Sequence, residues 1–250
     1  MARSKYFYTN FKDGVGPITQ DDGTVSSGTA ADVNLFTAGG IPWYYAVIGT
    51  QTVLAPALHD KGLDLTLTDT NGQGGSFVPY GINLGQPLQF TIGGPAFFCE
   101  WVVQVTDWSG CELLVGFQGG AAATGYAFNA TRGSITDMAL IGNNAGGGLN
   151  IFTTTNKNTG TATDTDTTID LIDGDVMKAK VLVSATGVVT YTLSKAATAT
   201  DTTFVAQTLT TAAFTFDDTD VVVPTLYTKS HTDDATLKVI KSFECGYQNA

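Results

Sequence analysis

The sequence predicts an all-β protein, built as a two-sheet antiparallel β-sandwich. Three observations lead to this fold class. Apolar and polar residues alternate with a period of two along several runs, which is typical of strands with one buried face. The composition, with 29 glycines and many threonines, favours strands and turns. No stretch has a sustained helical period, so strand follows strand and two packed sheets are the expected layers.

The chain of 250 residues is expected to divide into an N-terminal arm with a first strand, residues 1–35, and one sandwich domain, residues 36–250. A strand-like run at residues 6–11 has two interpretations. In the first, it pairs as an edge strand with a C-terminal strand at residues 237–247, which brings the termini together. Alternatively, the basic and aromatic arm attaches the protein to a larger assembly, because aromatic and arginine side chains are favoured in interfaces.

The first part of the sandwich domain contains short apolar runs separated by Gly and Pro. These runs predict short strands, and the second of them also permits a single helical turn. They lie at residues 43–48, 53–58, 63–67 and 88–92.

The clearest strands are predicted at residues 97–106 and 112–117. A loop at residues 107–111 with a central glycine is expected to join them as a hairpin. The predicted register pairs Trp101 with Phe117, which puts the large apolar side chains on one buried face. The residues expected in the core are Trp101, Val103, Val115 and Phe117.

After this hairpin, strands alternate with polar, Gly-rich or Thr-rich segments. A low-complexity segment at residues 153–168 is expected to be a long surface loop. A second hairpin is expected at residues 177–193, with its turn at residues 185–187. Pro224 has no backbone N–H, so the strand that contains it is expected at a sheet edge or a bulge. The other predicted strands lie at residues 125–129, 138–141, 221–227 and 237–247.

Charge and cysteine content exclude several classes of function. The net charge of −11 and the pI near 4.3 argue against a nucleic-acid or anionic-membrane surface, because both need clustered Lys and Arg. The three cysteines form no paired motif, so free thiols and a reducing compartment are expected. No signal peptide or membrane-spanning run is expected, since no apolar run is long enough.

No catalytic motif is present, and the chain is predicted not to be an enzyme. Glycoside hydrolysis uses two carboxylates about 5–10 Å apart. In the predicted hairpin, Glu100 and Glu112 lie on the order of 20 Å apart, although an aspartate could still serve. The two histidines, His59 and His231, have neither metal-ligand nor triad spacing. The third glutamate is Glu244.

Two sets of residues are candidates for ligand binding. Closely spaced aspartates suit Ca²⁺, but their spacing does not match an EF-hand, so an acidic loop and turn is the favoured reading and no metal or cofactor is predicted. This set is Asp164, Asp166, Asp170, Asp173 and Asp175. Aromatic residues stack on sugar rings, but core or subunit contacts are their commoner use. This set is Trp43, Tyr44, Tyr45, Trp108 and Tyr126.

Four segments carry a resemblance to a known family. They read Phe-Phe-x-Glu-x-x-Val-x-Val-x-Asp from residue 97, Glu-Leu-Leu-Val-Gly-Phe from residue 112, Ile-Asp-Leu-Ile-Asp-Gly-Asp from residue 169, and Lys-Ala-Lys-Val-Leu-Val-Ser from residue 178. Over residues 60–247 the sequence resembles concanavalin A-like sandwiches, such as laminin-G-type and legume-lectin-type domains. More narrowly, it resembles lectin-like jelly rolls of tailed-phage virion proteins, especially head decoration proteins.

This resemblance implies a capsid decoration or cement protein that binds the major capsid protein as a homo-oligomer, a trimer or a dimer. Such a protein is made in the host cytoplasm and is located on the virion. The alternative is a carbohydrate-binding, lectin-like module of a head or tail fibre, with a host glycan as its partner. Fold alone does not decide between these functions.

Overall fold

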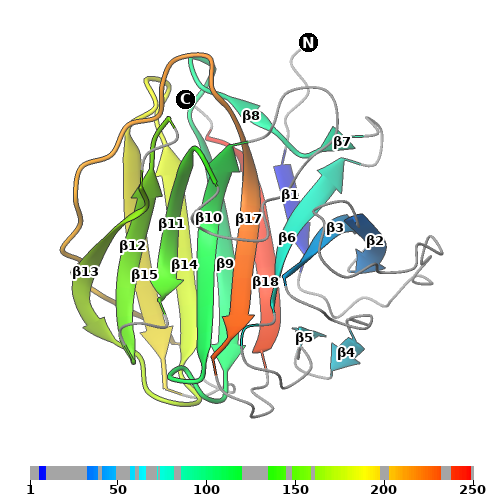
Figure 1. Cartoon of the computed structure of the whole chain (residues 1–250), viewed down its shortest axis with the longest axis vertical. Helices are drawn as coiled ribbons and strands as arrows, with labels where there is room; N and C mark the ends of the chain where they lie inside the picture. Colours follow the sequence, from blue (N-terminus) through cyan, green and yellow to red (C-terminus); the bar gives the residue numbers. More distant parts are fainter. Residues whose placement is uncertain are drawn as a thin grey trace.

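Two antiparallel β-sheets pack face to face (Figure 1). The computed structural model describes residues 6–9, 33–38, 41–48, 57–59, 62–65, 72, 74–81, 86–119, 135–144, 148–158, 161–197, 203–231 and 238–248. Every regular element in these ranges is a strand. The predicted all-β, two-sheet antiparallel sandwich is therefore confirmed.

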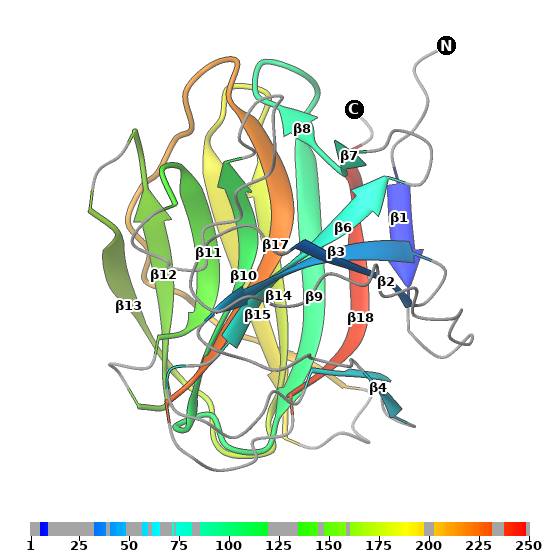
Figure 2. The ribbon, with the colours of Figure 1, turned by 45° about the vertical axis from the view of Figure 1, so that its right-hand side comes forward.

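The first sheet, sheet A, has eight strands in the order β16-β15-β14-β9-β18-β5-β4, with β1 also paired to β18. Figure 2 shows β1 beside β18. The predicted pairing of the N-terminal strand with the C-terminal strand is therefore confirmed, since Tyr6 lies opposite Gly246. The strands of sheet A are β1 (Tyr6–Thr9), β4 (Ala57–His59), β5 (Gly62–Asp64), β9 (Phe97–Val105), β14 (Val176–Val183), β15 (Val189–Ala196), β16 (Val205–Ala206) and β18 (Lys238–Tyr247).

The second sheet, sheet B, has ten strands in the order β13-β12-β11-β10-β17-β6-β3-β2, with β7 on β6 and β8 on β17. Its strands are β2 (Val33–Ala38), β3 (Ile41–Ile48), β6 (Gly74–Gly81), β7 (Gln86–Pro87), β8 (Phe90–Thr91), β10 (Cys111–Gly119), β11 (Met138–Asn143), β12 (Asn150–Asn156), β13 (Thr163–Asp170) and β17 (Val221–Ser230).

The predicted hairpin between residues 97–106 and 112–117 is wrong, although both strands exist, as β9 and β10. β9 belongs to sheet A and β10 to sheet B, so they face each other across the core instead of pairing. The link between them is fixed by Trp108, which is fully buried. Its backbone N–H donates to Asp173 Oδ1 at 3.0 Å and its indole N–H donates to the Asp175 carbonyl oxygen at 3.2 Å. These bonds tie the link to the turn before β14 and carry the chain from one sheet to the other.

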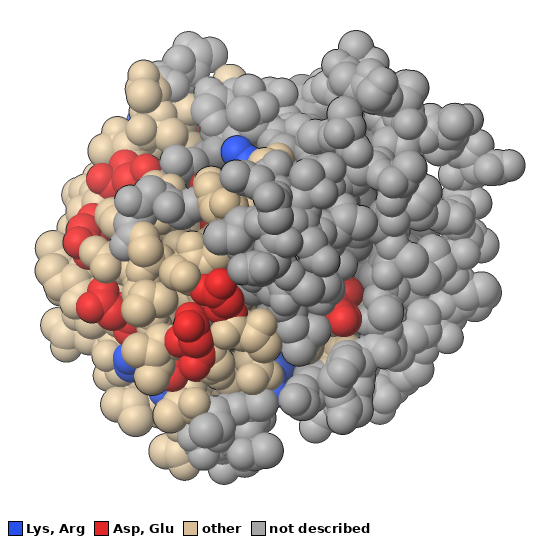
Figure 3. All heavy atoms as spheres, turned by 60° about the horizontal axis from the view of Figure 1, so that its bottom comes forward, with Lys and Arg blue, Asp and Glu red and all other residues tan. Residues whose placement is uncertain are grey.

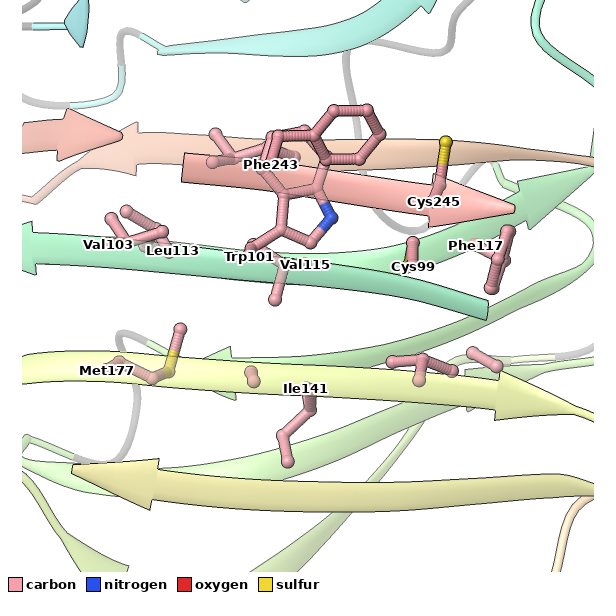
Figure 4. Close-up of a cluster of buried hydrophobic side chains, with 14 of the residues drawn as sticks. Cys99, Trp101, Val103, Leu113, Val115, Phe117, Ile141, Met177, Phe243 and Cys245 are labelled. Atoms are coloured by element: carbon pink, nitrogen blue, oxygen red, sulfur yellow. The ribbon is translucent and has the colours of Figure 1, made fainter. Parts of the chain in front are cut away.

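The predicted core is nevertheless confirmed, because both strands direct the expected face inward. Trp101, Val103, Val115 and Phe117 have no exposed surface. Trp101 and Phe243 lie against each other between the sheets, with ring centroids 4.2 Å apart (Figure 4). Close-packed aromatic pairs of this kind dominate the energetics of a core.

The second predicted hairpin is confirmed. β14 pairs with β15 from Val176–Ala196 to Val183–Val189. Lys178 and Lys180 point outward from sheet A, and Lys180 Nζ lies 4.0 Å from the centroid of the Phe98 ring. The long C-terminal strand is also confirmed, as β18.

Two predictions for the later chain are wrong. The Thr-rich segment at residues 153–168 contains most of β12 and β13, which pair with each other. Threonine is β-branched and fits a pleated surface, so a low-complexity Thr run can form strands. β17 lies between β10 and β6 and is not an edge strand. Pro224 is tolerated because the ladder to β8 covers Val221 and Val222 and the ladder to β6 begins at Leu226.

The remaining predicted strands are partly confirmed and partly lie outside the described residues. The strand predicted at residues 138–141 is β11, and Leu63 and Leu65 are buried beside β5. Residues 125–129, residues 53–56 and most of the N-terminal arm lie outside the described residues. Among the described residues, no helix is long and apolar enough to cross a membrane.

Candidate functional site

A pocket of about 390 Å³ lies where β12 ends and β13 begins. A further wall comes from Ala213, Phe214 and Thr215. These residues belong to the segment 203–217, which we call the strap. The strap follows the side of the sandwich between β15 and β13, as the orange trace in Figure 1 shows. The residues that matter for binding in the pocket walls are Thr155, Lys157, Thr161, Thr163, Phe214 and Thr215.

Backbone hydrogen bonds hold the strap on both sheets. On the sheet A side, Val189 N–H donates to the Phe214 carbonyl oxygen at 3.0 Å, and Phe216 N–H donates to the Gly187 carbonyl oxygen at 3.1 Å. On the sheet B side, Thr210 N–H donates to the Thr167 carbonyl oxygen at 3.2 Å. The strap thereby closes one open side of the sandwich and gives the pocket a fixed wall.

Gly187 is required for this arrangement. It has a φ of +81°, and a Cβ at this position would lie 2.6 Å from the Phe216 carbonyl oxygen. Only glycine accepts both the conformation and the close approach. The turn predicted at residues 185–187 therefore also positions the strap.

Two phenylalanines of the strap anchor it in different ways. Phe216 is buried, whereas Phe214 is half-buried and packs against the main core. Their rings meet edge to face, with centroids 5.0 Å apart. Phe214 thus brings an aromatic ring, held by a buried neighbour, into the pocket wall.

Four threonines line the pocket together with Phe214, and none of their hydroxyls has a hydrogen-bond partner among the described residues. Thr161, Thr163 and Thr215 are exposed, and Thr155 is half-buried. Each hydroxyl offers one donor and two acceptor lone pairs. The pocket therefore combines unused hydrogen-bonding groups with an aromatic surface.

One ion pair lies at the pocket rim. Lys157 Nζ lies 2.5 Å from Asp217 Oδ1 and donates to the Thr215 carbonyl oxygen at 3.1 Å. Asn158 Nδ2 donates to Asp217 Oδ2 at 2.6 Å. The hydrogen bonds from Lys157 and Asn158 hold the pKa of Asp217 below its usual range. The Asp217 carboxylate is therefore ionised and satisfied by these two side chains.

The structure removes two of the aromatic candidates for sugar stacking. Trp43 and Trp108 have no exposed surface. The side chains of Tyr44 and Tyr45, in β3, and the whole of Tyr126 lie outside the described residues. Phe214 was missed because its run, Phe-Thr-Phe, looks like any short strand; only its place in the strap distinguishes it.

The five candidate aspartates hold the local structure. Asp164 accepts from Thr154 Oγ1 at 2.6 Å and from Asn144 Nδ2 at 2.5 Å. Asp166 accepts from Asn150 Nδ2 at 3.2 Å. Asp173 accepts from the Trp108 backbone, Asp175 from the Ile172 backbone at 3.1 Å, and Asp170 ends β13. Asp164, Asp166 and Asp170 lie in strand β13, where the sequence reading expected a loop, whereas Asp173 and Asp175 lie in the expected turn.

The predicted distance between Glu100 and Glu112 needs a correction. Glu100 and Glu112 lie on the outer faces of different sheets, so the hairpin distance between them does not apply. Instead, Glu244 lies opposite Glu100 in register, on neighbouring strands of sheet A. Glu100 is paired with Lys178 at 2.8 Å on this face. Glu112 lies 3.6 Å from His231 Nε2, and the His59 side chain is outside the described residues.

All three cysteines are free and buried. Burial raises the pKa of each thiol, that of Cys111 to about 12. Because the thiolate is the reactive form, we expect no labelling of the native protein by a thiol-reactive disulfide reagent at neutral pH. Three thiols per chain should react in concentrated urea. Rapid labelling of any thiol without denaturant would contradict this burial.

Comparisons with known proteins identify the fold. No family model matches the sequence, and no curated protein matches it. The structure is similar to the lectin UEA-II complexed with galactose, at 11% identity and a TM-score of 0.53, over 98% of both chains. It is similar to the VIP36 exoplasmic/lumenal domain in its Ca²⁺/Man3GlcNAc-bound form, at 11% identity and a TM-score of 0.52, over 83% of this chain and 86% of that one.

A third similar structure is a legume lectin-like domain from Entamoeba histolytica, at 8% identity and a TM-score of 0.52, over 82% of this chain and 90% of that one. The VIP36 domain is a Ca²⁺-bound form. In the described part of this chain, no group of three or more His, Cys, Asp or Glu side chains could hold a metal ion. These residues therefore do not fit such a Ca²⁺ site. The chain has the concanavalin A-like, legume-lectin-like β-sandwich fold.

Proposed function

We propose that this protein is a carbohydrate-binding module and that the pocket beside the strap is its binding site. One observation carries the proposal: Phe214 and four threonines, whose hydroxyls have no hydrogen-bond partner among the described residues, line one pocket of about 390 Å³. This volume lies within the usual range for small-molecule sites, about 300–1,000 Å³.

The chemistry of the pocket suits a sugar. A sugar ring carries hydroxyl groups on its rim, which exchange hydrogen bonds with threonine hydroxyls. Its faces carry C–H groups, which pack on an aromatic ring such as Phe214. The pocket contains both kinds of group on rigid elements, two sheet strands and a hydrogen-bonded strap.

The structural comparisons give support of a general kind. UEA-II was solved with galactose and the VIP36 domain with Man3GlcNAc. At such low identity the similarity concerns the fold, and it favours a carbohydrate partner over a capsid partner.

Replacing pocket threonines by valine tests the proposal. Thr161→Val and Thr163→Val remove a hydroxyl and keep the β-branched shape. Each variant should weaken glycan binding about 2- to 12-fold, because one hydrogen bond contributes about 0.5–1.5 kcal/mol. The measurement is a glycan array with the wild-type chain, followed by calorimetric titration of the best ligand.

Thr192→Val is the matched control, because Thr192 is an exposed threonine on the outer face of sheet A, in β15. It should leave affinity unchanged. The proposal fails if the wild-type chain binds no glycan, or if the control and the pocket variants lose affinity equally.

The virion reading stays a prediction from the sequence resemblance. It comprises binding to the major capsid protein, assembly into a trimer or dimer, and a place on the capsid surface. The expectations of no enzymatic activity and no nucleic-acid partner also stay predictions. A carbohydrate-binding module is compatible with a virion location, since a fibre domain can bind host glycans.

A further inference from the structure

The charge at the pocket rim indicates which class of sugar the proposed site accepts. Lys157 supplies the cationic side chain in the pocket wall. Its ammonium group is already neutralised, because Nζ lies 2.5 Å from Asp217 Oδ1 and also bonds to the Thr215 carbonyl oxygen. An incoming anion would have to compete with Asp217 for this group.

Further carboxylates lie around the same ion pair. Asp137 Oδ1 accepts from the Asn158 backbone N–H at 2.9 Å, and Asp220 Oδ2 accepts from the Asp217 backbone N–H at 2.9 Å. Burial, and then repulsion by Asp137 and Asp217, raises the pKa of Asp220. The three carboxylates are therefore close enough to influence one another, and within the described part of the chain they outnumber the Lys157 ammonium group that lies beside them.

The rest of the molecule adds to this negative field. The chain has a net charge of −11. Figure 3, which brings the bottom of Figure 1 toward the reader, shows acidic side chains in several groups on the described surface and few lysines. A negative electrostatic potential disfavours anionic ligands both as they approach and when they are bound.

We infer that the pocket selects uncharged sugars over sugars that carry a carboxylate or a sulfate, and that Asp217 sets this selectivity by occupying Lys157. The inference rests on the carbohydrate-binding role proposed above. An acidic sugar meets repulsion from the carboxylates, and among the described pocket residues it finds only a cation that is already paired. Specificity of this kind comes from a repulsive element, not from an added attraction.

The substitution Asp217→Asn tests the inference. It removes one negative charge, retains a polar side chain of the same size, and releases the Lys157 ammonium group. Side chains of Asp217 and Lys157 are 44% and 40% exposed, so the variant should fold. Its melting curve checks this directly.

The matched control is Asp218→Asn. Asp218 is the next residue and is exposed, and its side chain accepts from the Thr219 backbone N–H at 3.1 Å. This control changes the net charge by the same amount and leaves the pair between Lys157 and Asp217 intact.

The probes are matched pairs of immobilised sugars, namely galactose and galacturonate, glucose and glucuronate, and mannose and mannuronate, with the full chain in low and high salt. The wild-type chain should prefer the neutral member of the pair that it binds. Asp217→Asn should reduce this preference about two- to fivefold, the range expected for an exposed charge pair. The reduction should be smaller in high salt, and the control should keep the wild-type ratio.

The outcomes separate the two proposals. If neutral sugars bind and Asp217→Asn leaves the ratio unchanged, or the control shifts it equally, the role of Asp217 is overturned while the carbohydrate site stands. If the wild-type chain prefers the acidic member, the selectivity is overturned. If the wild-type chain binds neither member of any pair and no other glycan, the carbohydrate role fails and this inference fails with it.

Discussion

Trp101→Ala should be the most destabilising of the substitutions considered, lowering the free energy of unfolding by about 3–5 kcal/mol. Trp101 has no exposed surface. Its ring centroid lies 4.2 Å from that of Phe243 and 5.8 Å from that of Trp43. Trp43 comes from sheet B, so the truncation leaves a cavity between the two sheets. Urea unfolding at equilibrium measures the loss.

Glu100→Ala is the control on the same strand, one residue away. Glu100 points outward from sheet A and pairs with Lys178, which is 38% exposed. The Glu100 side chain is itself 18% exposed. A solvent-exposed ion pair contributes about 0–1 kcal/mol, and this partly exposed pair leaves no core cavity when it is lost, so the control should cost clearly less than Trp101→Ala. Equal destabilisation by the two substitutions would mean that the inward and outward faces of β9 are assigned wrongly.

Gly116→Ala should have the second largest effect, at least about 1–3 kcal/mol from backbone strain. Gly116 has a φ of +152°, and a Cβ on it would lie 2.2 Å from the Ala139 carbonyl oxygen of β11. The added methyl group therefore has to push β10 and β11 apart. Because β10 lies between β11 and β17, this displacement disturbs the middle of sheet B. Thermal or urea unfolding measures the cost.

Gly119→Ala provides the comparison, because Gly119 is the last residue of the same strand. A Cβ there would meet the Asp137 Cβ at 3.3 Å, a tight contact with a side-chain atom, and Gly119 has no positive φ. This variant should lose clearly less stability than Gly116→Ala. Stability losses of the same size would contradict the close approach of β10 and β11 at Gly116.

The alternation of residue types predicted most strands and the direction of their side chains. In β9, Trp101 and Val103 are inward, and Glu100 is outward and paired with lysine. In β14 and β15, the predicted hairpin and its turn are both present. The reason is local: a strand with one buried face must alternate, and burial selects the apolar members.

Alternation does not reveal which strands are partners. β9 and β10 were expected to pair because they are adjacent in sequence and each has one apolar face. Two strands that face each other across a core show the same alternation as two strands that share a sheet. The burial of Trp108 and its hydrogen bonds to the turn before β14 place β9 and β10 in different sheets. These hydrogen bonds join Trp108 to residues 65 or more positions away in the sequence.

The pocket could not be predicted for a similar reason. Three of its threonines, Thr155, Thr161 and Thr163, belong to a segment that looked like a loop and contains most of two strands. Phe214 and Asp217 come from the strap, which reaches the β12–β13 hairpin only through hydrogen bonds to both sheets. The ion pair between Lys157 and Asp217 joins residues far apart in sequence, and no spacing pattern indicates it.

By itself, the sequence determined the all-β class, the core residues, and the inward and outward faces of the main strands. These depend on hydrophobic burial and on the period of a strand, which are properties of short segments. Only the tertiary structure decided that β9 and β10 belong to different sheets, that β17 with Pro224 is central, and that the strap places Phe214 and Asp217 beside the threonines of β12 and β13. These features depend on contacts between segments that are distant in the sequence. The free energy of such contacts cannot be inferred from the residue pattern of a short segment.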